Sequence, residues 1–225
     1  PEFSKETEFR LASHKALDHF LEAKDQGIQT RPVILGPVTF LLLGKMKDED
    51  NALSLLPKLL PVYEQLLKEL ADAGAGWVQI DEPMLVMDLP KGAAKAYETA
   101  YEKLSAVSGK LHLMLAAYFE GLRDNLELAV NLPTAGLHID LIRAPKQLDE
   151  VLAKWPGKKS LSLGVVDGRN IWRGDLTWAV KTIEKAADAI GNEWIQVAPS
   201  CSLLHTPVDL DQETGETLQR IKLAD

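Results

Sequence analysis

Short apolar runs alternate with amphipathic segments along most of the chain. Six runs have the composition of β-strands, and most are nearly continuous in hydrophobicity, which is typical of strands covered on both faces. They are Val33–Val38, Trp77–Asp81, Leu111–Phe119, Gly136–Ile142, Leu161–Val166 and Trp194–Ala198. Segments with a helical spacing of apolar residues lie around them: Ser4–Gln26, Leu53–Ala73, Lys91–Val107, Leu122–Asn131, Pro145–Lys154, Leu176–Ala189 and Asp211–Leu223.

This alternation predicts an α/β protein with a parallel sheet, because helices of this length suit right-handed βαβ connections. A doubly wound open sheet and a (β/α)₈ barrel both fit the order. No G-x-G-x-x-G follows a strand, and polar residues stand at the C-terminal ends of several strands, which favours a barrel. Six strands would make it an incomplete TIM-type barrel, with about six of eight parallel βα units. No linker interrupts the series, so we expect residues 1–225 to form one domain.

The strand ends carry the residue types from which a binding site could be built. Asp81, Asp140, Arg169 and Cys201 are the candidates for binding substrate at the barrel mouth. Asp81 and Glu82 are adjacent, so their side chains point to opposite faces and at most one of them faces the mouth. Acid–base chemistry or amine binding is one interpretation of this pair. A strand-end turn with solvated carboxylates is the other.

Two glycine-containing segments also follow strands. In the run from Val166 to Arg173, glycine permits a tight turn, and Arg169 could bind a carboxylate or phosphate through its planar guanidinium. The equally good alternative is that Arg169 pairs with an acidic residue at the strand ends. In the segment Leu35–Thr39, Gly36 predicts a backbone bend and close packing at the end of a strand.

Composition limits the possible functions. Twenty-five basic against 33 acidic residues give a net charge of −8, which argues against general nucleic-acid binding. No apolar run is long enough to predict a membrane span. The single cysteine excludes a disulfide within the chain and a four-Cys zinc site, and it fits a reducing, cytoplasmic location. His112, His138 and His205 are zinc-type ligands, but buried histidines with one partner are the commoner outcome.

Six motifs taken together resemble one family. They are GPVTFLLLGK (36–45), WVQIDEPMLV (77–86), AAYFEG (116–121), GLHIDLIRAP (136–145), GVVDGRNIWR (164–173) and SCSLLHTPVDL (200–210). In this order and spacing they look like the N-terminal half of cobalamin-independent methionine synthase, the 5-methyltetrahydropteroyltriglutamate–homocysteine methyltransferase. The resemblance implies two (β/α)₈ barrels, with zinc in the C-terminal barrel, which would be the partner of this chain. Folate polyglutamate and homocysteine would be the parent enzyme's substrates.

The resemblance also implies which residues stand at the zinc-ligand positions of the duplicated barrel. They are Leu115, Ala117, Asp140 and Cys201, so two of the four are apolar and no metal site is expected in this chain. The basic residues that hold the folate tail in the family lie in segments that precede this sequence. The fragment alone is therefore expected to be structural and inactive.

Other functions remain open at this stage. The main alternative is a stand-alone small-molecule-binding protein or lyase on an incomplete TIM barrel, using Asp81, Asp140 and Arg169. A redox or zinc protein is disfavoured by the single cysteine. The open sheet edges of an incomplete barrel also predict self-association.

Overall fold

The computed structural model describes residues 1–48, 51–107, 109–209 and 212. They form two compact units: unit 1 comprises residues 1–117 and 122–138, and unit 2 comprises the described parts of 118–121 and 139–225. The expectation of a single domain stays a prediction. The last predicted helix, Asp211–Leu223, lies almost wholly outside the described residues.

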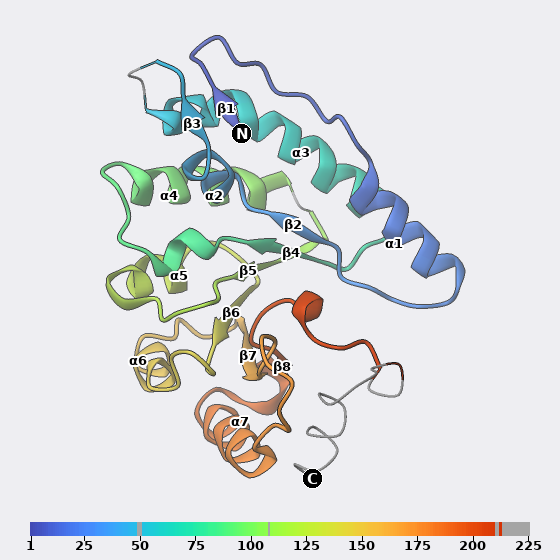
Figure 1. Cartoon of the computed structure of the whole chain (residues 1–225), viewed down its shortest axis with the longest axis vertical. Helices are drawn as coiled ribbons and strands as arrows, with labels where there is room; N and C mark the ends of the chain where they lie inside the picture. The colour runs from blue at the N-terminus through green and yellow to red at the C-terminus, as the bar shows by residue number, and fades with distance from the viewer. Residues whose placement is uncertain (49–50, 108, 210–211, 213–225) are drawn as a thin grey trace. The chain divides into compact units, whose positions relative to one another are not determined.

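Unit 1 contains most of the helices and strands. Its elements are β1 (Glu2–Phe3), α1 (Lys15–Asp25), β2 (Val33–Leu35), α2 (Pro37–Leu42), β3 (Lys45–Met46), η1 (Ala52–Leu55), α3 (Leu56–Asp72), β4 (Trp77–Asp81), η2 (Pro83–Val86), α4 (Ala93–Val107), β5 (His112–Ala116), η3 (Arg123–Asn125), α5 (Leu126–Asn131) and the start of β6 (Gly136–Asp140). Helices α2, α3 and α4 contact one another and lie together alongside the sheet (Figure 1).

The sheet of unit 1 has the strand order β2-β4-β5-β6, and every neighbouring pair is parallel. Its register places four apolar residues in one row across the strands: Ile34, Ile80, Leu115 and Leu137. The last three of these are fully buried, so this row belongs to the core. By contrast, Val33 is 53% exposed, so β2 is not covered on both faces as the central strands are.

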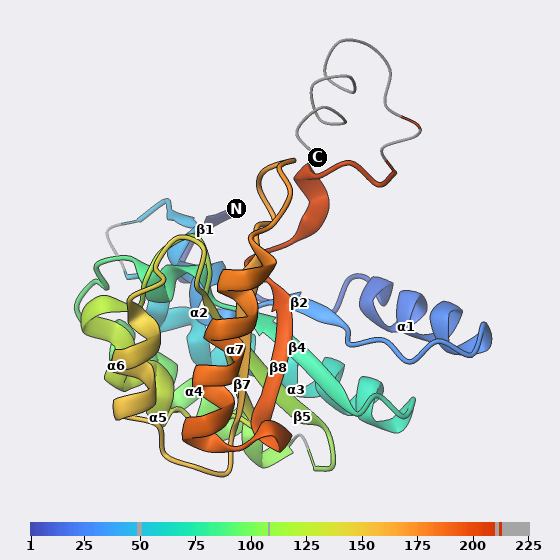
Figure 2. The same cartoon turned by 90° about the horizontal axis from the view of Figure 1, so that it is seen from below.

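Unit 2 repeats the same strand-and-helix pattern. It contains the end of β6, then α6 (Gln147–Ala153), β7 (Ser160–Val166), α7 (Leu176–Ile190), η4 (Asn192–Trp194), β8 (Ile195–Pro199) and η5 (Leu203–His205). Strands β7 and β8 are parallel, with a bulge between Gly164 and Val166. Just after β6, the Leu141 N–H donates to the Gly164 carbonyl of β7 at 3.1 Å. Helix α7 packs along β7 and β8 (Figure 2).

Parallel strands joined by helices confirm the predicted α/β class. The expected strand Val33–Val38 was too long, because the chain turns into helix α2 at Pro37. Proline is favoured at a helix start, where its fixed φ is helical and its missing N–H costs nothing. The expected strand Leu111–Phe119 likewise ends earlier, at Ala116, before Phe119 takes a positive φ of 80°.

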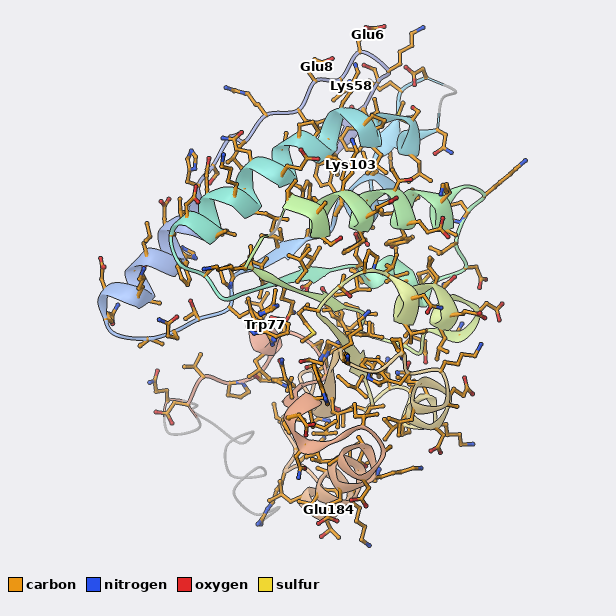
Figure 3. All side chains as sticks on the ribbon, turned by 180° about the vertical axis from the view of Figure 1, so that it is seen from behind. Glu6, Glu8, Lys58, Trp77, Lys103 and Glu184 are labelled. Carbon is orange, nitrogen blue, oxygen red and sulfur yellow. The ribbon has the colours of Figure 1, made fainter. Side chains whose placement is uncertain are left out.

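The predicted helix Ser4–Gln26 is correct only in its second half, since α1 begins at Lys15. The preceding segment, residues 4–14, lies along α3 instead. Lys58 of α3 donates to the backbone carbonyls of this segment and forms an ion pair of 2.7 Å with Glu8, and both side chains are labelled in Figure 3. Phe9 packs edge-on against Phe3 with ring centroids 5.7 Å apart. Phe9, whose spacing suggested a helix, therefore lies outside α1 and packs in an aromatic cluster.

Within the described residues, no helix is both long enough and apolar enough to cross a membrane.

Candidate functional site

The carboxylate of Glu82 lies at the end of β4 in unit 1 and is completely buried. Its two oxygens accept hydrogen bonds from the first N–H groups of α2, from Val38 at 3.3 Å and from Thr39 at 2.7 Å. Two tyrosines of α4 donate their hydroxyls to the same carboxylate, Tyr97 at 3.3 Å and Tyr101 at 3.1 Å. The neighbouring residues thus leave this carboxylate no contact with solvent, and its role is to fix α2 against α4.

Gly36 allows this arrangement. A Cβ atom at this position would lie 2.1 Å from Cδ of Glu82, which is inside van der Waals contact. The bend expected at Gly36 is therefore confirmed as a close approach of backbone to a side chain. The interpretation of Asp81 and Glu82 as solvated turn carboxylates is wrong for Glu82, which is sealed by residues far away in sequence.

Burial raises the pKa of Glu82 to about 7, although the hydrogen bonds from Thr39, Tyr101 and Val38 act in the opposite direction. A charged carboxylate loses its hydration when it is buried, and the four donors only partly replace it. Asp81 differs from its neighbour: it is partly exposed, and Gln79 donates to its Oδ1 at 2.8 Å. Asp81 also favours the charged form of Arg31, whose pKa is lowered by burial.

Unit 2 contains a polar pocket of about 340 Å³ at the ends of its three strands. Its lining residues are Asp140 and Arg143 after β6, Asp167, Arg169 and Asn170 after β7, and Ser200 after β8. The carboxyl ends of parallel strands are the usual place for ligand sites in (β/α)₈ and related folds. The pocket brings together two of the four predicted site residues, Asp140 and Arg169.

Asp140 is 1% exposed and organises the backbone around the pocket. Its Oδ1 accepts from the N–H groups of Ile142 and Arg143, at 3.0 and 2.9 Å. Its Oδ2 accepts from the N–H of Phe119 at 3.0 Å. Burial raises the pKa of Asp140, and these three backbone hydrogen bonds oppose that shift. Asp140 therefore ties two loops together at the pocket wall.

The loop after β7 is held in a similar way by Asp167. Its carboxylate accepts from the backbone N–H of Arg169 at 2.8 Å and from the side-chain amide of Asn170. Gly168 donates its N–H to Ser200 Oγ at 3.2 Å, and a Cβ at this glycine would lie 2.8 Å from the carbonyl oxygen of Cys201. The glycine is needed because the loop rests directly on the backbone after β8.

Phe119 and Arg169 contact each other at the same pocket. The guanidinium carbon of Arg169 lies 5.0 Å from the centroid of the Phe119 ring, within the range of a cation–π interaction. Phe119 has a φ of 80°, which is strained for a residue with a side chain, and the hydrogen bond to Asp140 holds it there. Strain of this kind is concentrated at functional sites in proteins.

Cys201 lies next to the pocket and is buried. Burial raises the pKa of its thiol, so the thiolate is disfavoured. Its Sγ is 3.6 Å from the Ser202 carbonyl oxygen, to which it donates. These surroundings give a structural thiol rather than a nucleophile.

Among the histidines considered as ligands, His112 is exposed and stacks on Trp77 with ring centroids 4.9 Å apart. His138 is buried in unit 1, and the side chain of His205 lies outside what the structure describes. Within the described residues, no group of three or more His, Cys, Asp or Glu side chains is placed to hold a metal ion.

Sequence reasoning missed four residues of these two sites: Tyr97 and Tyr101 at Glu82, and Arg143 and Asn170 in the pocket. The burial of Glu82 depends on tyrosines of α4, and no local signal points to them. Arg143 and Asn170 could have been found from the sequence. Each lies three residues after a strand-end aspartate, Arg143 after Asp140 and Asn170 after Asp167. Side chains at that spacing commonly meet the aspartate in a turn.

Comparisons with known proteins match most of the chain to a single family. The family profile described as "Cobalamin-independent synthase, N-terminal domain" matches residues 1–191. A 5-methyltetrahydropteroyltriglutamate–homocysteine methyltransferase of Nitrobacter winogradskyi is 55% identical over 215 residues, which is 95% of this chain and 28% of the relative. A protein of the same name from Salinibacter ruber is 54% identical over 217 residues, covering 96% and 28%. The chain spans little more than a quarter of these relatives.

Two solved structures share the fold. A Listeria monocytogenes protein has a TM-score of 0.69 at 15% identity, covering 98% of this chain and 71% of that one. A B12-independent methionine synthase from a Shewanella species, solved in complex with selenomethionine, has a TM-score of 0.66 at 14% identity, covering 96% and 65%. These likenesses, with the parallel strands, confirm the predicted fold class, an incomplete (β/α)₈ barrel.

Proposed function

Because the chain belongs to the cobalamin-independent synthase family, as its N-terminal domain, we propose that it forms part of the half of a methyltransferase that does not hold the zinc. The parent enzyme would transfer a methyl group from 5-methyltetrahydropteroyltriglutamate to homocysteine. The observation that carries this proposal is the match of residues 1–191 to the N-terminal-domain profile, together with relatives that are 55% identical and bear that activity in their names.

The partner of the chain would be the remainder of the same enzyme. The chain matches less than a third of each of the relatives compared, so most of the enzyme's length lies outside the match. In this view the chain supplies scaffold and a wall of the substrate site, and the reaction itself takes place on the C-terminal barrel. The 225 residues alone would then transfer no methyl group.

We further propose that this chain holds no zinc. Two positions that correspond to ligands in the duplicated barrel are the buried apolar residues Leu115 and Ala117, which have no lone pair to donate. At a third position, the carboxylate of Asp140 already accepts three backbone N–H groups. These residues do not fit a tetrahedral zinc site. Elemental analysis of the purified chain after mild dialysis tests this, and near-stoichiometric zinc would contradict it.

A chimera tests the proposed activity. The matching 215 residues of the Nitrobacter winogradskyi relative are replaced by those of this chain, and methionine formation from the labelled methyl-folate triglutamate is measured. We expect an active chimera and no product from the chain alone. A soluble, folded chimera without activity, or zinc-dependent methionine formation by the chain alone, would overturn the proposal.

The chimera needs a matched pair of variants to separate scaffold from chemistry. Glu82→Ala removes the buried carboxylate that joins α2 to α4, and Glu98→Ala removes an exposed carboxylate of α4 that pairs with Lys95. If the chain acts as scaffold, the first variant loses activity together with thermal stability, whereas the second retains both.

A further inference from the structure

In the polar pocket of unit 2, the acidic side chains hold the backbone of the loops, whereas the guanidinium groups of the basic side chains do not. Asp140 accepts three backbone N–H groups, and Asp167 accepts one backbone N–H and the Asn170 amide. Both carboxylates are thus committed to holding the loops of the pocket. They are positioning residues: of the roughly four acceptor sites of a carboxylate, three are occupied at Asp140 and two at Asp167.

The two arginines of the pocket have the opposite character. Within the described residues, neither the Arg143 nor the Arg169 guanidinium donates a hydrogen bond or forms an ion pair. Arg169 is instead held over the Phe119 ring, a contact that leaves its in-plane N–H groups available. Each guanidinium carries five N–H donors in a planar fork whose geometry matches a carboxylate.

We propose that this pocket binds a small monocarboxylate, with the guanidinium groups of Arg143 and Arg169 as the ligands of its oxygens. Asn170 and Ser200 line the same pocket. Their side chains are already hydrogen-bonded, Asn170 to Asp167 and Ser200 to Gly168 and Cys201, so the proposal rests on the two arginines. The volume of about 340 Å³ suits a compact ligand rather than a nucleotide or a cofactor.

The charge balance of the pocket favours a monoanion over a dianion. Two guanidinium groups face two carboxylates, Asp140 and Asp167, so the pocket has no large excess of positive charge. A phosphate dianion would bring its second charge close to those carboxylates, and like charges repel at this distance. A carboxylate carries one charge and matches one guanidinium fork.

The backbone strain at Phe119 fits the same role. Phe119 takes a positive φ, its N–H donates to Asp140, and its ring lies against the Arg169 guanidinium. The ring contact orients the Arg169 guanidinium before any ligand arrives. A preoriented side chain loses less conformational entropy on binding.

This inference goes beyond the proposed function, and each can fail alone. The experiment is a titration of the 225-residue chain with sodium propionate, followed by the Nε–Hε NMR signals of its arginines. Sodium chloride at the same ionic strength is the reference, and inorganic phosphate is the second arm. We expect saturable shifts at Arg143 and Arg169 with propionate, weaker binding of phosphate, and no saturable shift with chloride.

Variants sharpen this titration. Arg169→Gln and Arg143→Gln are each expected to weaken propionate binding about tenfold. Arg169→Lys, which keeps the charge and loses the planar fork, should weaken binding by less. Arg173→Gln is the matched control, because Arg173 is exposed in the same loop and does not line the pocket. The backbone amide spectrum verifies that each variant is folded.

Three outcomes would overturn the inference. One is propionate shifts no larger than those with chloride. Another is binding that survives both single arginine-to-glutamine substitutions unchanged. The third is phosphate binding tighter than propionate, which would assign the pocket to a different anion. If the glutamine variants fail to fold, the folded Arg169→Lys variant decides: unchanged affinity would show that the guanidinium fork does not contact the ligand.

Discussion

Glu82 in unit 1 and Asp140 in unit 2 are strand-end carboxylates that do the same local work with different results. Each accepts backbone N–H groups and so fixes the chain that follows or faces its strand. The hydroxyls of Tyr97 and Tyr101 close the environment of Glu82, whereas Asp140 lines a pocket that contains two arginines. A strand-end carboxylate is therefore not in itself a functional signal. The residues around the carboxylate determine whether it only stabilises the fold, as Glu82 does, or also lines a pocket, as Asp140 does.

Removing the two carboxylates should separate the two cases most clearly. Glu82→Ala leaves two N–H groups and two hydroxyls buried without an acceptor, so we expect the free energy of unfolding to fall by about 4 kcal/mol. Asp140→Ala should lower the free energy of unfolding by about half as much. The three backbone N–H groups that lose their acceptor lie at the pocket, where water can replace the carboxylate. Urea unfolding measures both, with Glu98→Ala as a control near zero. Equal losses at 82 and 140 would remove the distinction.

A second expected effect is on the pH dependence of stability. The pKa of Glu82 is about 7 in the folded chain and about 4.5 when unfolded, so the folded state binds more protons between these values. Stability is therefore highest below pH 4.5 as far as this group is concerned. It falls as the pH rises to 7, by about 3 kcal/mol.

Urea unfolding across this pH range measures the slope. In Glu82→Gln, which cannot ionise, that part of the slope should disappear, whereas Asp140→Asn should keep it. A wild-type slope that survives Glu82→Gln would show that another group titrates.

Gly36 provides a smaller test of how tightly the Glu82 site is packed. In Gly36→Ala the new methyl group meets the carboxylate, so we expect a loss of about 2–3 kcal/mol. Gly76→Ala is the matched control, because a Cβ there meets no atom within 4 Å. Thermal unfolding of both variants gives the comparison. A Gly36→Ala protein as stable as Gly76→Ala would mean that the Glu82 side chain moves aside without cost.

The smallest expected effect concerns Phe119. Phe119→Gly relieves the positive φ but removes the ring from beneath Arg169, so the two effects oppose each other. The free energy of unfolding should change by less than about 1 kcal/mol. Amide hydrogen exchange at residue 119 should nevertheless become faster, because the loop loses the ring contact. A large loss of stability would show that the ring is part of the core.

The sequence predicted the strands of the core well and their ends poorly. The strand Trp77–Asp81 has the predicted bounds, because apolar runs report directly on burial. Helix α2 was missed because Pro37 and Val38 continue an apolar run, and the acceptor that starts the helix comes from Glu82, 44 residues later. Periodicity contains no information on such distant partners.

The candidate site was predicted in part for the same reason. Asp140 and Arg169 do share a pocket in unit 2, since both follow parallel strands. Asp81 lies in unit 1 beside Gln79 and near Arg31, and Cys201 is a buried thiol near the pocket rather than part of its lining. Strand position alone predicted which end of the sheet to inspect. The sequence does not show which of these side chains are hydrogen-bonded. Only the structure distinguishes the carboxylates that hold the loops from the arginines whose guanidinium N–H groups face the pocket.

The bulge in β7 has a consequence for any change in the length of that strand. Gly164 and Val166 pair with the adjacent residues Ala198 and Pro199, so one extra residue is inserted relative to β8. Odd and even positions therefore exchange faces within the strand. Deleting Val165 would leave Gly164 and Val166 adjacent and still opposite Ala198 and Pro199, so the ladder would become regular. The strand would then lose the bend and extra twist that a bulge gives it just before Asp167 and Arg169. The direction in which this loop leaves β7 therefore depends on one residue inside the sheet.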